Sequence, residues 1–261
     1  RNLEKGLKEL DQVIVTDPLQ ADVALCSGVS MVIKETIQKV KEKGVKLIVR
    51  LDNVPRNSRN RNTGTSRLKS YAEQADGVIW QCNWARDYLR GFIDRKGEII
   101  YNGVDMDIFN VTGARIDFGN RNDVYLYSRF NRDETKNWEV AWFKFQMIAR
   151  ENINAKLVIV GKFSPEQEQY NFDFFRGEKV EYRGIVDNPV EMARIMRGCG
   201  HLLATYYNDC YSNTYLEALA CGMNLYEPDM SGGTPELMKV GVRTIKQMSE
   251  DYLRVFEGVI K

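Results

Sequence analysis

The sequence predicts an α/β protein made of two Rossmann-like, doubly wound parallel-sheet domains that face a cleft. First, apolar runs of strand length alternate with amphipathic stretches along the whole chain, which is the pattern of repeated βαβ units. Second, a connection rich in Gly, Asp and Asn separates two such series. Third, a chain of 261 residues that is 43% hydrophobic can give one large domain, or each of two small ones, a full core.

The first series occupies residues 1–100, where we expect a compact N-terminal domain. Its apolar runs predict strands at 12–16, 22–26, 45–51, 77–80 and 98–100. A helix is predicted at 29–43, because apolar residues recur there at helical spacing, with Ser27 or Ser30 available to cap its start and Gly44 to end it. A second helical pattern lies near 67–74.

A polar loop is predicted between the strand at 45–51 and the helical pattern near 67–74, with the sequence VPRNSRNRNTGTSR at 54–67. It is either a solvated surface loop or a rim that meets a polar or anionic acceptor. The spacing of its residues does not decide between the two.

The second series is expected to form a domain at 101–244. Its apolar runs predict strands at 123–127, 156–160, 180–182, 202–205 and 223–226, each followed by a helical pattern. The stretch 245–259 predicts a terminal helix, within a C-terminal segment at 245–261. In two facing domains of this class, ligands bind outside the carboxyl ends of the strands.

The charge balance argues against nucleic acid as a partner. Lys and Arg number 37 and Asp and Glu 36, which leaves a formal net charge of +1 and little bulk attraction for nucleic acid or anionic membranes. No stretch approaches the roughly 20 apolar residues that cross a bilayer. We therefore expect a cytoplasmic protein without a transmembrane segment, while peripheral contact with a membrane stays open.

Cysteine and histidine usage limits the chemistry further. The five cysteines are widely spaced and form no Cys-x-x-Cys pair, so a reducing compartment is expected, with neither a disulfide framework nor a zinc site. The single histidine, His201, begins an apolar run and is expected to be structural. Mechanisms that need several imidazoles are excluded.

Two cations follow the first strand of the second domain. The segment SRFNRDETKNW places Arg129 at the carboxyl end of that strand and Lys136 near the start of the next helix. An Arg fork, a Lys ammonium and the N–H groups of a helix start suit a pyrophosphate. Solvent-facing charge is the alternative interpretation.

Two carboxylates occur in the segment DCYSNTYLEALACG at 209–222. If the helix begins near Ser212, Glu217 falls on its second turn and Asp209 on the loop before it, so both can face one ligand. Carboxylates accept hydrogen bonds from vicinal hydroxyls, which fits a ribose at one end and a hexose at the other. Tyr211, Ser212 and Asn213 would present backbone N–H groups to phosphates. A helix merely capped by Asp209 or Ser212 is the alternative.

The order of five motifs resembles a known family. NGVDMDIF, SRFNRDETKN, VIVG, DCYSNTYLEALACG and SGGTPE follow one another as in the carboxyl-terminal half of the retaining nucleotide-sugar glycosyltransferases of the GT-B fold (glycosyltransferase family 4-like, "glycosyl transferases group 1"). The resemblance covers 101 to about 239 well and 46–100 more loosely, through RLDNVP and ADGVIWQCNWARDYL. It implies a hexosyltransferase that uses a nucleoside diphosphate sugar as donor and retains the configuration, with no metal and no other cofactor.

The resemblance also implies a donor site. Arg129 and Lys136 match the pair that holds the donor diphosphate, and Glu217 matches the Glu that binds the donor ribose. The phosphate and sugar loop would be formed by Tyr211, Ser212, Asn213 and Thr214. Asn102 and Gly103 match the turn that links the two domains.

Two catalytic candidates depart from the family pattern. Asp209 stands where a Glu faces the transferred sugar, and Asp52 stands near the place where many relatives carry a His. Asp52 would orient the acceptor or donor sugar; alternatively it pairs with Arg50 or Arg56, or caps the following turn. The acceptor is expected to be a glycan, a glycoprotein or a lipid-linked molecule.

Two other functions are alternatives to the transferase. The shortened N-terminal domain and the missing His also fit a catalytically inactive protein of the same fold that binds nucleotide sugars or acts as a scaffold. A nicotinamide-dependent oxidoreductase is disfavoured, because no strand is followed by Gly-x-Gly-x-x-Gly.

Overall fold

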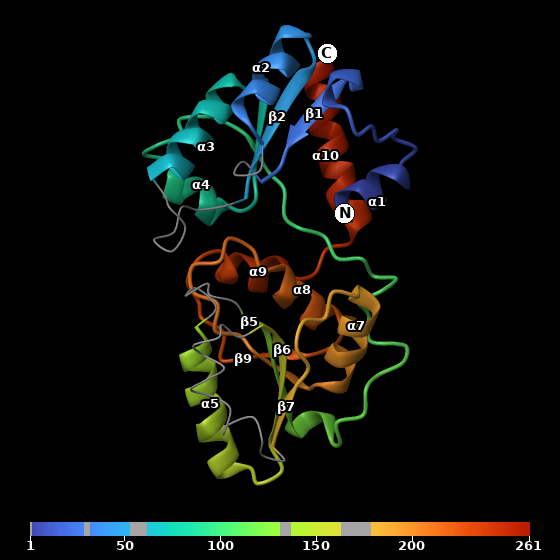
Figure 1. Cartoon of the computed structure of the whole chain (residues 1–261), viewed down its shortest axis with the longest axis vertical. Helices are drawn as coiled ribbons and strands as arrows, with labels where there is room; N and C mark the ends of the chain where they lie inside the picture. Colours follow the sequence, from blue (N-terminus) through green and yellow to red (C-terminus); the bar gives the residue numbers. More distant parts are fainter. Residues whose placement is uncertain (1, 29–31, 53–61, 131–136, 163–178) are drawn as a thin grey trace. The chain divides into compact units, whose positions relative to one another are not determined.

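The computed structural model describes residues 2–28, 32–52, 62–130, 137–162 and 179–261, with the backbone alone described at 62–64, 129 and 130. The chain divides into two units (Figure 1). The first contains Arg1–Gly103 together with Pro235–Lys261, and the second contains Val104–Thr234. The C-terminal segment expected at 245–261 is thus grouped with the first unit.

The first unit is built on a four-stranded parallel sheet in the order β1-β2-β3-β4. Its strands are β1 (Val23–Cys26), β2 (Lys46–Leu51), β3 (Gly77–Trp80) and β4 (Glu98–Ile99). These confirm four of the five predicted strands. The strand predicted at 12–16 is wrong: that segment pairs with no strand, Val13 is 88% exposed, and Asp17 caps a 3-10 turn, η1 (Pro18–Gln20), directly after it.

Helices cover both faces of this sheet (Figure 1). On one face lie α2 (Lys34–Glu42), α3 (Asn62–Gln74) and α4 (Asn83–Leu89), packed on a core that includes Val49, Leu51 and Trp80. On the other, Met248 and Tyr252 of α10 (Ile245–Ile260) pack on Ile48, Ile79 and Ile100, and α1 (Asn2–Lys8) lies beside α10. The predicted C-terminal helix is confirmed.

Two helix starts differ from the sequence predictions. The cap of α2 is Ile33, which offers no side-chain hydrogen bond, so Ser27 does not cap it; Ser30 lies outside the described residues. Gly44, at φ +80°, follows the helix as expected. The third helix begins at Asn62, so the polar loop predicted at 54–67 ends earlier than expected.

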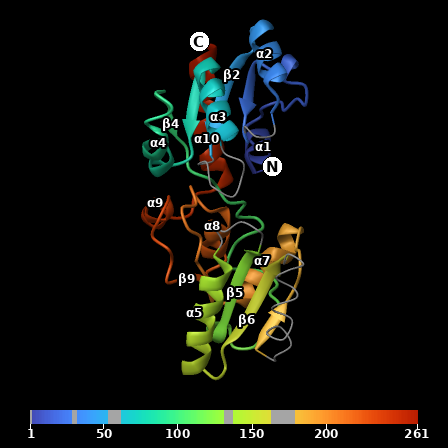
Figure 2. The ribbon, with the colours of Figure 1, turned by 60° about the vertical axis from the view of Figure 1, so that its left-hand side comes forward.

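The second unit is built on a five-stranded parallel sheet in the order β7-β6-β5-β8-β9. The strands are β5 (Val124–Phe130), β6 (Lys156–Gly161), β7 (Val180–Tyr182), β8 (His201–Leu203) and β9 (Asn224–Tyr226), and each confirms a predicted strand. One face is covered by α5 (Trp138–Glu151), and the other by α7 (Pro189–Gly198) and α8 (Asn213–Ala220) (Figures 1 and 2). The predicted α/β class with two parallel-sheet units is confirmed, and the reversal of strand order that defines double winding is found in the second sheet.

Several smaller expectations concern single residues. His201 is structural: its ring stacks on Tyr125 at 4.8 Å between centroids, and its Nε2 lies 3.1 Å from the carbonyl oxygen of Asn122. All five cysteines are buried and free. Among the described residues, no helix is both long enough and apolar enough to cross a membrane.

Candidate functional site

The strand order of the second unit creates a switch point between β5 and β8. These strands are neighbours in the sheet, but the chain leaves β5 toward β6 on one side and reaches β9 from β8 on the other. In open parallel sheets, ligands bind in the crevice outside the carboxyl ends of the two strands at such a point. The predicted donor residues follow these two strands.

The segment after β8 leads into a capped helix. The Ser212 hydroxyl accepts a hydrogen bond from the Tyr215 backbone N–H at 3.4 Å, so α8 begins at Asn213 as predicted. The side chains of Ser212 and Thr214 are buried, whereas Asn213 is exposed at the helix start. The first-turn N–H groups of an α-helix carry partial positive charge and suit an anion.

Two tyrosines that the sequence analysis did not single out hold this segment against β5. The Tyr206 backbone N–H donates to the Tyr215 hydroxyl at 2.8 Å, and the two rings stack 4.9 Å apart. The Tyr206 hydroxyl donates in turn to the carbonyl oxygen of Ser128 on β5. Burial raises the pKa of Tyr215 well above its usual value, so this hydroxyl stays protonated. The loop after β8 is therefore tied to the end of β5.

A second loop, which contains the SGGTPE motif, makes hydrogen bonds to the segment that follows β8. The Ser231 hydroxyl accepts a hydrogen bond from Asn208 N–H at 2.7 Å, and Gly233 N–H donates to the Asp209 carbonyl oxygen at 2.8 Å. Gly232 has φ +64°, and a Cβ added there would lie 2.4 Å from the same carbonyl oxygen. Only glycine fits this close approach. Backbone contacts thus fix the position of Asp209.

The structure places most of the predicted donor residues on this one loop and helix. Asp209 is half-buried on the loop, and Glu217 is half-buried on the second turn of α8. Tyr211 is buried between them in the chain. The backbone of Arg129 lies near the carboxyl end of β5, and its side chain is outside the described residues, as is the whole of Lys136.

Asp52 lies in the first unit, directly after β2, and is half-buried. Within the described residues it forms no ion pair with Arg50, whose guanidinium instead donates to the Asn102 side-chain oxygen. The other proposed partner, Arg56, lies outside the described residues. The pKa of the Cys26 thiol is raised to about 11, mainly by burial and to a smaller extent by the negative charge of Asp52. The Asp52 carboxylate therefore lies near Cys26, at the end of β1.

The predicted Asn102–Gly103 turn is held against α10. A Cβ at Gly103 would lie 2.4 Å from the carbonyl oxygen of Thr244, the residue that caps α10. The Gly103 N–H donates to the sulfur of Met248 at 3.2 Å. These contacts hold the chain in one position where it leaves the first sheet after β4.

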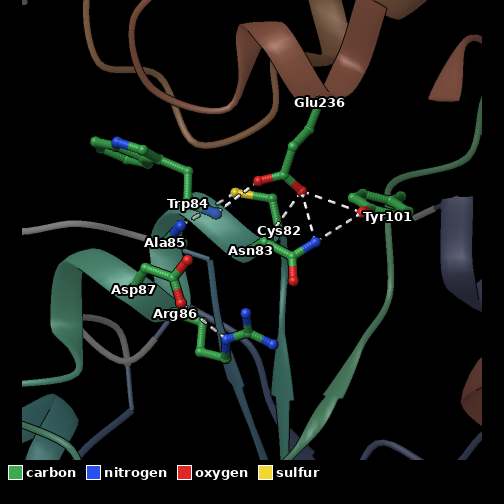
Figure 3. Close-up of polar contacts among 8 residues, drawn as sticks. All are labelled: Cys82, Asn83, Trp84, Ala85, Arg86, Asp87, Tyr101 and Glu236. Atoms are coloured by element: carbon green, nitrogen blue, oxygen red, sulfur yellow. Dashed lines mark hydrogen bonds and ion pairs between the residues drawn. The ribbon is translucent and has the colours of Figure 1, made fainter. Parts of the chain in front are cut away.

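Glu236 of the SGGTPE motif was given no role by the sequence analysis, and the structure gives it a clear one. It lies in α9 (Thr234–Val240), and its carboxylate covers the start of α4 (Figure 3). It accepts hydrogen bonds from Asn83 N–H at 2.9 Å, Trp84 N–H at 2.6 Å and the Asn83 side-chain amide at 3.0 Å. The Tyr101 hydroxyl donates to it at 3.1 Å. No local sequence signal could have revealed this cap, because its partners lie far away in the chain.

Comparison with known proteins gives one family and several solved structures. A family model described as "Glycosyl transferases group 1" matches residues 121–252. HepE from Anabaena, solved in complex with UDP and glucose, is 13% identical, with a TM-score of 0.66; the alignment covers 99% of this chain and 71% of HepE. No curated protein matches the chain.

Two other solved structures have the same fold. The pneumococcal O-GlcNAc transferase GtfA, in complex with UDP and GlcNAc, is 12% identical with a TM-score of 0.63, over 99% of this chain and 60% of GtfA. Sucrose-phosphate synthase from Thermosynechococcus elongatus is 14% identical with a TM-score of 0.57, over 86% of this chain and 69% of the synthase. These likenesses confirm the predicted GT-B fold class.

Proposed function

The chain belongs to the glycosyl transferases group 1 family, and on that premise we propose that it moves a hexose from a nucleoside diphosphate sugar to an acceptor hydroxyl, with retention of configuration. The observation that carries the proposal is the braced loop and helix start after β8, at the switch point of the second sheet. Ligands of parallel α/β sheets bind at this place.

Each part of the donor has a proposed partner. The α8 start, Arg129 and Lys136 bind the diphosphate, because backbone N–H groups and cations suit its oxygens. Glu217 accepts hydrogen bonds from the ribose hydroxyls, and Asp209 accepts one from the transferred sugar. The α8 start, Arg129 and Lys136 would neutralise the leaving diphosphate without a metal ion. Metal independence has a direct test: turnover should be unchanged by excess EDTA.

The proposed reaction exchanges one bond at the anomeric carbon for another. The bond from this carbon to the diphosphate oxygen breaks with both electrons going to the oxygen, and a bond to the acceptor oxygen forms on the same face. The acceptor's hydroxyl proton passes to the departing diphosphate, so no protein nucleophile is needed. The acceptor is a glycan, a glycoprotein or a lipid-linked molecule.

The proposed location is the cytoplasm. All five cysteines are buried and free, which suits a reducing compartment.

Binding of the donor is tested first. UDP, GDP, ADP and TDP sugars should be compared by thermal shift, because a ligand at one hundred times its Kd stabilises by about 2.7 kcal/mol. UDP sugars are the first choice, since the solved structures of HepE and GtfA contain UDP. Binding with release of UDP on adding acceptor supports the transferase; binding without release supports the inactive scaffold. No binding in the whole panel contradicts both.

Glu217→Ala should weaken the binding of the nucleoside diphosphate by about 10- to 100-fold, because hydrogen bonds to a charged carboxylate are lost. Calorimetry measures the loss. Glu191→Ala, at an exposed position of α7, is the matched control and should bind like the parent protein. Unchanged affinity in the Glu217 variant would refute the ribose assignment.

Asp52→Asn should lower kcat while leaving donor binding nearly intact. The amide keeps the shape of the side chain but loses the charge that would stabilise positive charge on the sugar ring in the transition state. Steady-state kinetics and donor calorimetry separate the two effects. Full turnover at normal stability would remove Asp52 from the catalytic proposal.

A further inference from the structure

The first unit contains a cavity of about 440 Å³ that the proposed transfer reaction does not use. Its walls come from Trp80 at the end of β3, from α4, and from the segment 90–97 that leads into the edge strand β4. The volume falls within the range of roughly 300–1,000 Å³ that small-molecule sites have. The proposed donor loop, by contrast, belongs entirely to the second unit.

Four cations and two carboxylates line the cavity. One of the carboxylates is already neutralised, because Arg86 Nε lies 3.1 Å from the Asp87 carboxylate in an ion pair that Figure 3 shows. Arg95 is held in place by donating to the carbonyl oxygens of Ala75 at 2.7 Å and Glu73 at 3.4 Å, at the end of α3. Because these carbonyl acceptors carry no net charge, they do not compensate the positive charge of the Arg95 guanidinium.

The remaining two cations are Arg90 and Lys96. Within the described residues, neither side chain makes a hydrogen bond or an ion pair, and both residues are exposed. Only Asp94 on the cavity wall opposes them and Arg95. The lining therefore carries an excess of positive charge with unused N–H donors, which attracts an anion.

Trp80 forms the inner wall of the cavity. Its side chain is 1% exposed, and its indole nitrogen is buried and finds no acceptor among the described residues. Because this nitrogen has no surface open to the cavity, it does not donate to a ligand there. The ring nevertheless lies at the cavity wall, where its emission can report a bound ligand.

We propose that this cavity binds a phosphate-bearing anion. The Arg90 guanidinium and the Lys96 ammonium offer a planar fork and a point charge, both of which suit phosphate oxygens. A carboxylate has fewer oxygens for these donors. The phosphate belongs either to a soluble anion or to the headgroup of an anionic lipid.

The experiment compares the full chain with a cavity variant, Arg90→Gln with Lys96→Gln, in two arms. Both arms are run without UDP, because its diphosphate is itself a phosphate-bearing anion that would compete for the cavity. Anion binding at the proposed donor site would be lost equally little in the cavity variant and in the control. The first arm titrates inorganic phosphate and follows tryptophan emission, with the signal of Trp80 identified from a Trp80→Phe variant. The second measures cosedimentation with vesicles of phosphatidylglycerol or of phosphatidylcholine.

A matched control carries Lys39→Gln and Lys43→Gln, two exposed positions in and after α2 that lose the same charge. We expect the cavity variant to bind at least about 10-fold more weakly, and the control to bind within about 2-fold of the parent chain. A selective loss for phosphate identifies a soluble anion. A selective loss for phosphatidylglycerol vesicles, without binding of phosphate, identifies a lipid headgroup.

Two results would overturn the proposal: equal losses in the cavity variant and the control, or no binding by the parent chain in either arm. Failure of the proposed transferase function leaves both arms interpretable, because neither measures turnover and the mutated residues lie outside the donor loop.

Discussion

Replacing Glu236 with Gln should lower the free energy of unfolding of the first unit by about 2–4 kcal/mol. The carboxylate accepts two backbone N–H groups at the start of α4, from Asn83 at 2.9 Å and Trp84 at 2.6 Å, with one oxygen for each. An amide keeps one oxygen and turns an NH₂ toward the other donor. At least one of these hydrogen bonds is therefore lost.

The magnitude follows from two contributions. A hydrogen bond to a charged group contributes roughly 1.5–3 kcal/mol, and a negative charge at a helix start a further 0.3–1 kcal/mol. One oxygen of Glu236 accepts hydrogen bonds from three donors: the Asn83 N–H, the Asn83 side-chain amide and the Tyr101 hydroxyl. If the NH₂ of Gln takes the place of this oxygen, the loss of stability lies at the upper end of the range.

Urea unfolding followed by tryptophan emission measures the effect, because Trp84 lies at the capped end of α4. Glu250→Gln, an exposed position on α10, makes the same chemical change without a capped helix and should change stability by less than about 0.5 kcal/mol. Equal midpoints and slopes for the two variants would refute the capping role of Glu236.

Two further outcomes are expected. Gly232→Ala should reduce kcat/KM for sugar transfer by at least about 10-fold, because its Cβ would displace the Asp209 backbone; Gly241→Ala has a similar positive φ but open space, so it should lose only about 1–2 kcal/mol of stability. Full transfer activity in the Gly232 variant would contradict this reasoning. Burial, reinforced by Asp52 and opposed by Arg50, raises the pKa of Tyr252 to about 12, so between pH 10 and 12 the unfolded chain loses this proton while the folded chain keeps it. Stability should fall by at most about 3 kcal/mol over that interval, and Tyr252→Phe, but not Tyr88→Phe at an exposed site, should reduce the fall in alkaline urea titrations.

The parallel sheets could be predicted because their strands are buried on both faces. Runs such as KLIVRL of β2 and KLVIVG of β6 are nearly continuous in apolar residues, which is typical of strands covered by helices on each side. The run at 12–16 is also rich in β-branched apolar residues, but it pairs with no strand. Composition alone does not show whether a segment has a neighbouring strand to pair with. This is why the strand prediction failed there.

Within the candidate site, the local features were predictable and the long-range contacts were not. The Ser212 cap and the position of Glu217 follow from spacing along one helix. The Tyr206–Tyr215 hydrogen bond and the Glu236 cap depend on which segments the fold brings together. Sequence spacing carries no information about such pairs.

The division of the first unit between two separate stretches of chain affects the order in which the protein can fold during synthesis. Ile48, Ile79 and Ile100 are made before the second unit, whereas the helix that covers them, α10, is made after it. The second unit is continuous and has all its strands as soon as Thr234 has been added. The first unit is therefore completed only after the second, and until α10 has been made one face of its sheet exposes isoleucines that a chaperone can bind and that favour aggregation.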